Sequence, residues 1–284
     1  VALTLTTDYS VDLTNGRITL VADAVGRITA DIKGSKPGGT YIESAGKIIR
    51  EIVSTYGGLT DPGDLDTAAF SAIETANPSA VGIYINSSIN MQEVLDELAN
   101  TIGAFYGFDR SGKFTLSRIE AASGVADAEY DSTNIIEIIR LASEIPNYRV
   151  SVDYKKNNLV MDESDFGASI TTAQRDYLVR ESLSEIASDT NVSTSYPSSQ
   201  TLAVQGLFAA TGAASAEATR LLNLYKVQRE IYRIKVKVSP YTLKLNDVVK
   251  ITFNRYNLTS GKLFRVISIT EDAAVNEIEL ELWG

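Results

Sequence analysis

Residues 231–238, which read Ile-Tyr-Arg-Ile-Lys-Val-Lys-Val, decide the fold class of this chain. Apolar and polar side chains alternate, with Ile, Ile, Val and Val expected on one side and Tyr, Arg, Lys and Lys on or near the other. This period of two is typical of a strand with one buried face. Three more β-type stretches follow, at residues 245–253, 263–269 and 278–282. The end of the chain is therefore predicted to be a β meander, in which residues 231–238 offer an edge to a partner chain.

The beginning of the chain also has the pattern of strands. Residues 9–13 alternate, Asn15-Gly16 follows, and residues 17–20 resume the alternation. Asn-Gly between two alternating runs predicts a β-hairpin in which both turn residues take positive φ. A third alternating run occupies residues 28–32. The Gly-rich residues 34–39 then interrupt the pattern and predict a domain boundary.

The apolar spacing changes to that of helices in the next part of the chain. Residues 45–53 predict a first helix. Asp64 or Asp66 is expected to cap a second helix, and Asn90 a third helix whose apolar face extends to Phe105. Strands are also predicted at residues 81–85, 113–119, 135–141 and 148–154. A polar loop is predicted at residues 193–199 and a helix at residues 213–228. Residues 171–186 fit neither the helix nor the strand pattern clearly.

The chain contains neither histidine nor cysteine, which removes most catalytic templates. A Ser-His-Asp or Cys-His mechanism cannot form, nor can an imidazole or thiolate metal site. Carboxylate-pair chemistry, Ser-Lys chemistry and an oxygen-ligand metal site remain open. The net charge of −10 disfavours a phosphate backbone as the main partner, so no sequence-specific nucleic acid is expected. Lys155 and Lys156 are the densest pair of cations, and we interpret them as a solvated strand end or turn.

The sequence starts at Val1 with no basic leader and no apolar run of signal length. We therefore expect no secretory precursor, but a chain that is either trimmed or the C-terminal part of a longer one. No stretch reaches the roughly 18 apolar residues of a membrane span. The most apolar segment, residues 202–218, is short and rich in Ala and Gly.

Two groups of carboxylates are candidates for chemistry. The first group, in a Pro-Gly turn, consists of Asp61, Asp64 and Asp66. These aspartates could offer oxygen ligands to calcium, but their spacing is not that of an EF-hand loop. Helix capping explains them instead. Asp162, Glu163 and Asp165 form an acidic loop, and a glycosidase needs such a pair of carboxylates. Acids in a polar loop are usually solvated, so no catalytic residue is assigned.

Aromatic and Gly-rich stretches give weaker signals. Trp283 and the group Phe105, Tyr106 and Phe108 could form a platform on which sugars stack. Phe105 is expected in the core, and Trp283 against a barrel or at an interface. The Gly-rich stretches fit neither phosphate-loop motif and are interpreted as breaks between elements: residues 34–39 and 57–58.

Three stretches carry a resemblance to a known family. The C-terminal stretch consists of Leu245-Asn-Asp-Val-Val-Lys-Ile-Thr252, Arg255-Tyr-Asn-Leu258, Gly261-Lys-Leu-Phe-Arg-Val-Ile267 and Glu279-Leu-Glu-Leu-Trp-Gly284. The middle stretch consists of Val81-Gly-Ile-Tyr-Ile85, residues 94–98, Gly103-Ala-Phe-Tyr-Gly-Phe108 and Gly112-Lys-Phe-Thr-Leu116, and the N-terminal stretch of Tyr9-Ser-Val-Asp-Leu13 with Gly16-Arg-Ile-Thr-Leu20. In their order along the chain, they resemble the hub or tip proteins of siphophage and prophage tails, distantly like the central hub of contractile-tail baseplates.

The resemblance implies a structural component of a phage tail tip, a hub that caps the tail tube and links it to host-recognition proteins. It implies self-association as a homotrimer and contacts with neighbouring tail proteins: the distal tail protein, the tube, and a fibre or spike. The implied location is the distal end of the tail in the virion, after assembly in the host cytoplasm. It offers no catalytic, cofactor-binding or metal-binding residues and no cofactor, so the chain is not expected to be an enzyme.

The predicted fold class is α+β, with β-barrel-like regions at both ends and an inserted helical α/β domain. The predicted domains are a β-rich segment at 1–34 that continues from a missing N-terminal part, an α/β insert at 35–120, and a β-rich hub domain at 121–284 with a helix near 213–229. Two alternative functions stay open. A cell-wall hydrolase on the tail would need a cleft with two carboxylates about 5 to 10 Å apart. A carbohydrate-binding module for receptor recognition would need an exposed aromatic strip.

Overall fold

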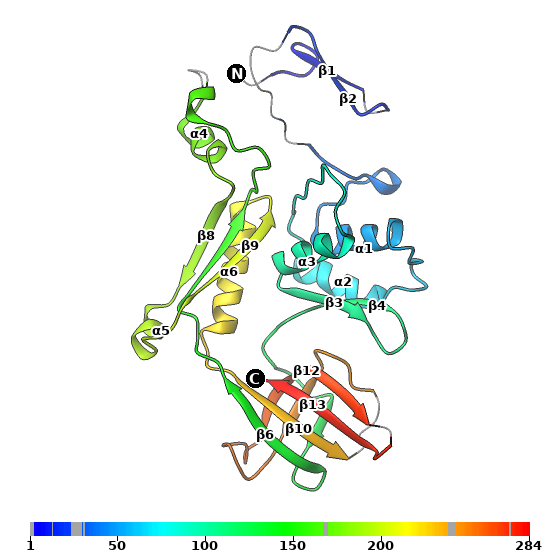
Figure 1. The fold of residues 1–284 in the computed structure, drawn as a ribbon, viewed down its shortest axis with the longest axis vertical. Coiled ribbons are helices and arrows are strands. Elements are labelled where there is room, and N and C mark those ends of the chain that lie inside the picture. Colours follow the sequence, from blue (N-terminus) through cyan, green and yellow to red (C-terminus); the bar gives the residue numbers. More distant parts are fainter. Residues whose placement is uncertain are drawn as a thin grey trace. The chain divides into compact units, whose positions relative to one another are not determined.

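The computed structural model describes most of the chain: residues 3–12, 14–23, 30, 32–166, 170–237, 242–272 and 274–284. Runs of helices and runs of strands follow one another in it, and the strands form mainly antiparallel sheets, which confirms the predicted α+β class (Figure 1). The chain divides into two compact units, one formed by residues 1–42 and 156–183, the other by residues 43–155 and 184–284. The predicted domain boundaries after residues 34 and 120 stay a prediction.

The first unit contains the predicted β-hairpin, made of β1 (Tyr9–Asp12) and β2 (Arg17–Leu20) in antiparallel pairing. Its turn is wider than predicted, because the last strand pair joins Asp12 to Arg17 and only Gly16 of the Asn15-Gly16 pair has positive φ, 59°. The Asp12 carboxylate accepts hydrogen bonds from the backbone N–H (3.1 Å) and the side-chain amide (2.6 Å) of Asn15. Such Asx contacts stabilise the longer turn in place of a two-residue one.

Three short helices complete the first unit: the 3₁₀ turns η1 (Pro37–Gly39) and η2 (Glu163–Asp165), and helix α4 (Thr172–Leu178). A capping box between Thr171 and Gln174 starts α4, so part of the ambiguous stretch is helical. Met161 is the only buried hydrophobic residue among the described members of this unit. Parts of three predicted strands lie outside the described residues: Leu13, residues 28–29 and 31, and Val238.

The second unit begins with three helices and a hairpin. They are α1 (Ala45–Thr55), α2 (Thr67–Ala76), α3 (Met91–Thr101), β3 (Ala104–Phe108) and β4 (Phe114–Arg118). As predicted, Asp66 and Asn90 cap α2 and α3, accepting backbone N–H groups at 3.1 Å and 3.0 Å. The prediction for Phe105 was wrong, because Gly103 takes a φ of +61° and ends the helix before it. Phe105 therefore lies on β3.

Residues 81–85 do not form the predicted strand. Val81 makes a single antiparallel bridge to Phe208, and the chain after it has no regular structure. Tyr84 and Ile85 are instead 63% and 47% exposed. The sequence is suited to a strand, but in the part of the chain that the structure describes no further strand pairs with it.

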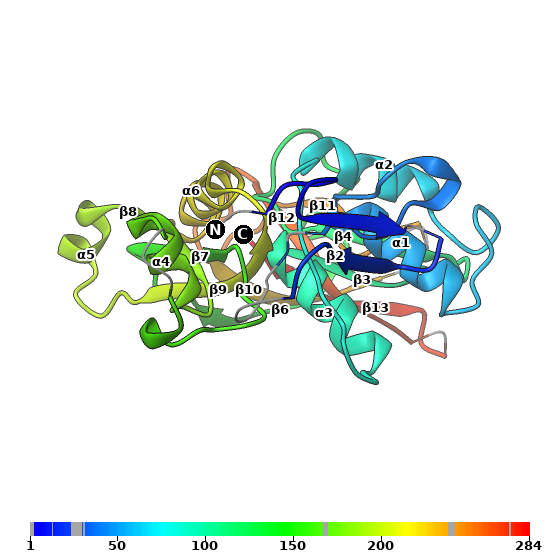
Figure 2. The same ribbon diagram turned by 90° about the horizontal axis from the view of Figure 1, so that it is seen from above.

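A three-stranded sheet lies in the middle of the second unit, in the order β8 (Leu183–Ser188), β7 (Arg149–Tyr154), β9 (Thr201–Phe208). Helix α6 (Thr211–Tyr225) packs against β7 and β9 (Figure 2), and α3 also contacts β9. Between β8 and β9 lies a short helix, α5 (Thr190–Ser195), capped by Asp189. The predicted loop at 193–199 was therefore wrong in its first three residues.

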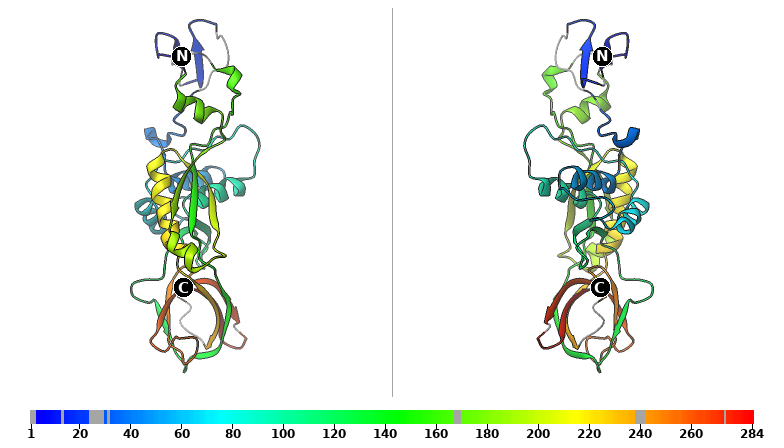
Figure 3. Two further views of the ribbon diagram at one scale, coloured as in Figure 1. Left: turned by 90° about the vertical axis from the view of Figure 1, so that its left-hand side faces the viewer. Right: turned by 90° about the vertical axis from the view of Figure 1, so that its right-hand side faces the viewer.

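The largest sheet curls into a half-barrel at the C-terminal end of the chain (Figure 3). Its strands are β5 (Ala128–Tyr130), β6 (Ile135–Ser143), β10 (Glu230–Lys237), β11 (Val248–Ile251), β12 (Lys262–Asp272) and β13 (Glu277–Trp283), in the order β5-β11-β12-β13-β10-β6. Strands β11 to β13 form the predicted meander. β10 was predicted to form an edge of the sheet. This prediction was wrong, because β10 pairs with β13 on one side and with β6 on the other.

The half-barrel encloses the hydrophobic core that β10 helps to build. Tyr232, Ile234 and Val236 share its buried face, so the predicted placement of this tyrosine on the polar side was wrong. The ring of Tyr232 packs edge-on against Phe264 at 5.4 Å, and its hydroxyl donates a hydrogen bond to Glu230 at 2.7 Å. A tyrosine can be buried here because its polar end keeps a partner.

Candidate assembly surface

The free edge of the half-barrel along β6 is the candidate functional surface. β6 pairs with β10 on one side, and among the described strands none pairs with its other side. Ile136, Ile139 and Leu141 project from it with 45%, 40% and 41% of their surface exposed. Long edge strands are usually shortened, charged or covered, because their unpaired N–H and C=O groups invite another chain. This edge spans nine residues and is largely apolar, so it suits pairing with a partner.

The opposite edge of the same sheet differs in kind. β5 is three residues long and runs parallel to β11. So short an edge offers few backbone groups to a partner. Among the described strands, the well-developed free edge of this sheet is therefore the one along β6.

The outer face of the half-barrel carries two strands of opposite charge. Arg233, Lys235 and Lys237 alternate along β10, opposite Glu281, Glu279 and Glu277 of β13. The Arg233 guanidinium lies 2.8 Å from Glu281, a hydrogen bond that raises the pKa of Arg233, and Lys235 lies 3.7 Å from Glu277. Exposed pairs of this kind add little to stability. Their alternation favours one register of the two strands over its neighbours.

A buried carboxylate fixes α6 to the end of the β3–β4 hairpin. Glu217 on α6 is 2% exposed and accepts hydrogen bonds from Arg118 on β4 (2.5 Å) and Arg220 on α6 (2.6 Å). Burial lowers the pKa of Arg118, whereas for Arg220 the effect of burial is outweighed by its hydrogen bonds to Glu217, which raise the pKa. Arg220 also donates to the backbone oxygen of Ile119 at 2.8 Å. The helix and the hairpin thus hold each other in place.

Trp283 at the end of β13 is buried, so it offers no platform for sugars. It is 5% exposed, and its indole N–H donates to Glu144 at 2.9 Å. The guanidinium of Arg229 lies 4.8 Å from the ring centre, and Tyr225 of α6 packs edge-on at 6.2 Å. The tryptophan therefore joins the half-barrel to α6, and its predicted packing against a barrel is confirmed.

The three aspartates of the Pro-Gly turn have separate structural partners. Asp61 accepts a hydrogen bond from Arg50 at 2.8 Å, and this contact lowers the pKa of the carboxyl. Asp64 accepts from the backbone N–H of Thr60 at 2.8 Å, and Asp66 caps α2. In the described part of the chain, no group of three or more carboxylates could hold a metal ion. The turn is thus explained by capping and one ion pair.

The acidic loop also lacks the surroundings of a catalytic site. Asp162, Glu163 and Asp165 lie in and beside η2, and all three are exposed. A glycosidase acid needs a pocket that favours its neutral form, whereas these three side chains lie in solvent. These residues have the environment of ordinary surface carboxylates.

The aromatic group on β3 is only partly exposed. Tyr106 donates a hydrogen bond to Asp96 at 2.6 Å, and burial followed by this contact raises its pKa to about 12. Phe105 is half-buried, whereas Phe108 is 64% exposed and packs edge-on against Phe114 at 5.5 Å. One exposed ring remains, which is not a strip on which a sugar chain could stack.

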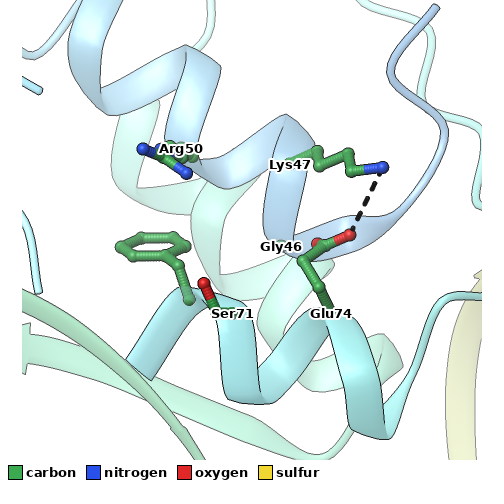
Figure 4. Close-up of a pocket in the computed structure, with 6 residues that line it drawn as sticks. Gly46, Lys47, Arg50, Ser71 and Glu74 are labelled. Atoms are coloured by element: carbon green, nitrogen blue, oxygen red, sulfur yellow. Dashed lines mark ion pairs between the residues drawn. The ribbon is translucent and has the colours of Figure 1, made fainter. Parts of the chain in front are cut away.

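A shallow hollow of about 180 Å³ lies between α1 and α2 (Figure 4). Its lining includes Lys47 and Arg50 of α1 and Glu74 of α2. Lys47 lies 3.7 Å from Glu74, and Arg50 pairs with Asp61, so both cations are already neutralised. Sites for small molecules are usually larger, roughly 300 Å³ or more. The hollow therefore fits packing between two helices better than binding.

The pattern of residues 135–141 predicts a strand at β6 but not its position at an edge of the sheet. The signal was present in residues 135–141, Ile-Ile-Glu-Ile-Ile-Arg-Leu, which are apolar at positions of both faces. Such a run indicates burial on both sides or a partner. No helix in the described ranges is both long and apolar enough to cross a membrane.

Comparison with known proteins matches the fold and not the sequence. No protein-family model and no curated protein sequence matches the chain. The tail protein from Neisseria meningitidis MC58 superposes with a TM-score of 0.50 and 12% identity, covering 84% of this chain and 66% of that one. A chain of the virion of a native gene transfer agent particle superposes with a TM-score of 0.51 and 17% identity, covering 83% of this chain and 46% of that one.

The chain shares the fold of these tail and virion proteins. The predicted resemblance to tail proteins is thereby confirmed at the level of the fold. The chain spans slightly less than two thirds of the first of these proteins and less than half of the second. At such low identity the match does not carry over any residue role.

Proposed function

We propose that the chain is a structural component of a phage tail tip, a hub that caps the tail tube and links it to host-recognition proteins. The observation that carries the proposal is the fold match to a tail protein and to a virion chain over more than four fifths of this chain. The free apolar edge of β6 supports it, because a protein whose role is assembly needs a surface that another chain completes.

The proposal includes the absence of an enzymatic role. The sequence has no histidine or cysteine, and its two groups of candidate carboxylates serve as caps and turns or lie in solvent. A structural role accounts for these residues without further assumptions, whereas a hydrolase would need an acid kept protonated in a cleft.

The proposed assembly is a homotrimeric ring at the distal end of the tail. A closed ring can use each exposed edge once and leave none in solvent. Neighbours on either side would be the distal tail protein, the tube, and a fibre or spike. The net charge of −10 suits a channel for DNA, since repulsion keeps the genome from adhering to the wall.

Antibody-gold labelling of tailed particles from the source, viewed by electron microscopy, tests the proposal. We expect label at the distal tail end, abolished when the antibody is first saturated with the free protein. Intact particles without label, together with free protein in the lysate, would contradict a virion role and make an assay of cell-wall hydrolysis the next experiment.

A further inference from the structure

Residues 82–90 form a second surface without a partner. The backbone is held at its start, where Val81 donates to Glu43 at 2.7 Å and Gly82 donates to Leu207 at 2.9 Å. It is held again at Asn90, the cap of α3. Across the described ranges, no hydrogen bond involves residues 83–89. Backbone groups in this loop are therefore available to another chain.

The side chains of this loop are unusual for a surface loop. Tyr84, Ile85, Ile89 and Met91 are 63%, 47%, 46% and 36% exposed. Residues 75–92 contain no Asp, Glu, Lys or Arg, although 22% of the chain is charged. Tyrosine and methionine are enriched and charges depleted at the centres of protein interfaces. The composition thus indicates contact with protein.

The sequence of the loop also favours a strand that the single chain does not form. Ile83-Tyr-Ile85 combines β-branched and aromatic residues, which prefer strands. In an extended chain Ile83 and Ile85 would share one face and Tyr84 the other. A segment with this preference and with unpaired backbone groups can become a strand by pairing with the free edge of a sheet.

We propose that residues 83–86 of one copy pair as an added strand with the free edge of β6 in a second copy. This inference rests on the proposed self-association and names its contact. Each chain supplies both halves of the contact: an unpaired apolar edge and an unpaired β-prone segment. Because the two segments are different, the contact can repeat head-to-tail from copy to copy, as in a ring or a filament.

Charge is compatible with this partner. Each copy carries a net charge of −10, so two copies repel each other, and a contact that avoids acidic surface adds least to this repulsion. The loop is uncharged, and β6 has no net charge, since it contains one acid, Glu137, and one base, Arg140. A partner attracted by opposite charge would instead need a charged loop.

Cysteine cross-linking tests the contact, because the chain has no cysteine of its own. Full-length Tyr84→Cys is mixed with a differently tagged Ile139→Cys chain and oxidised. Residues opposite each other on paired strands lie about 4.5–5.5 Å apart at Cα, a range that a disulfide spans. Parallel mixtures with Ile136→Cys and Leu141→Cys cover the other registers.

The matched control replaces Tyr84→Cys by Tyr56→Cys, an aromatic residue at the end of α1 that is 78% exposed. We expect at least one β6 position to give the mixed disulfide with Tyr84→Cys in roughly tenfold excess over the control, because paired strands hold the thiols at a high effective concentration. A yield equal to the control at all three positions would overturn the proposal. A dominant disulfide between two Ile139→Cys chains would also overturn it, since it would indicate two β6 edges paired with each other.

Light scattering of the cysteine-free chain separates this inference from the proposed function. Multimers without a cross-link between the loop and β6 would reject the contact and leave the role in the tail intact. A chain that stays single in solution and is absent from particles would reject both.

Discussion

Glu217 balances two arginines with one carboxylate and is 2% exposed. Glu217→Ala removes the buried carboxylate that Arg118 and Arg220 share, so we expect a loss of about 3–5 kcal/mol in the free energy of unfolding, measured by urea denaturation. Glu120→Ala is the control, because that carboxylate lies 3.3 Å from Arg220 but is 44% exposed. It should cost about 1 kcal/mol or less. Equal losses in the two variants would contradict the view that Glu217 fixes α6.

Asp247 is a carboxyl group whose ionised form is disfavoured in the folded state. Burial, with a further contribution from nearby Asp127, raises its pKa. An acid with a higher pKa in the folded state ionises first in the unfolded chain, so its contribution to stability falls as pH rises above the unfolded pKa. Asp247→Asn should therefore raise the free energy of unfolding at neutral pH, and the gain should disappear near pH 3, below the ordinary pKa of about 3.9.

Denaturation at the two pH values measures this effect, with Asp131→Asn as the comparison. Hydrogen bonds from Thr133 lower the pKa of Asp131, so its ionised form is favoured in the folded state and its loss should destabilise the protein at neutral pH. If Asp247→Asn destabilised the chain to the same extent at both pH values, its hydrogen bond to the backbone N–H of Lys244 would matter more than its charge.

At the scale of elements, helix α2 tests whether the aspartates of the Pro-Gly turn act as caps. Asp66 accepts the N–H of Ala69, so Asp66→Ala should lower the free energy of unfolding by about 1 kcal/mol, whereas Asp66→Asn retains a capping oxygen and should cost much less. Thermal unfolding in calcium and in EDTA should give the same Tm for the unmodified protein. A Tm that rises with calcium would restore the metal-site alternative.

The elements also show what sequence patterns can predict. Helices α1 to α3 and strands β11 to β13 were predicted because their apolar periods and caps are local. The stretch at residues 81–85 has strand composition, but among the described residues only Val81 makes a bridge to a strand, and pairing is not a local property. Tyr232 was placed on or near the polar side from the alternation of the stretch, whereas it is buried and its hydroxyl donates to Glu230. Residues such as these depend on neighbours distant in sequence.

At the scale of the molecule, the order of strands was not predictable. The sequence contains the meander, but it does not reveal that β10 enters the sheet beyond β13 or that β6 becomes the free edge. The candidate surface was missed for the same reason. The apolar run of β6 was visible, and only the sheet order shows that one of its sides lacks a strand.

The charge of the whole chain leads to a prediction about how copies associate. Copies with a net charge of −10 repel one another, while the proposed contact through β6 is apolar. Raising the salt from about 0.05 M to 0.5 M shortens the Debye length and should strengthen association, measured by sedimentation. Ile139→Lys should weaken it about tenfold or more, since an unpaired charge would be desolvated in the contact. Tyr56→Lys, exposed but away from β6, should leave it nearly unchanged, and association that weakens with salt would mean that ion pairs, not the apolar edge, hold the copies together.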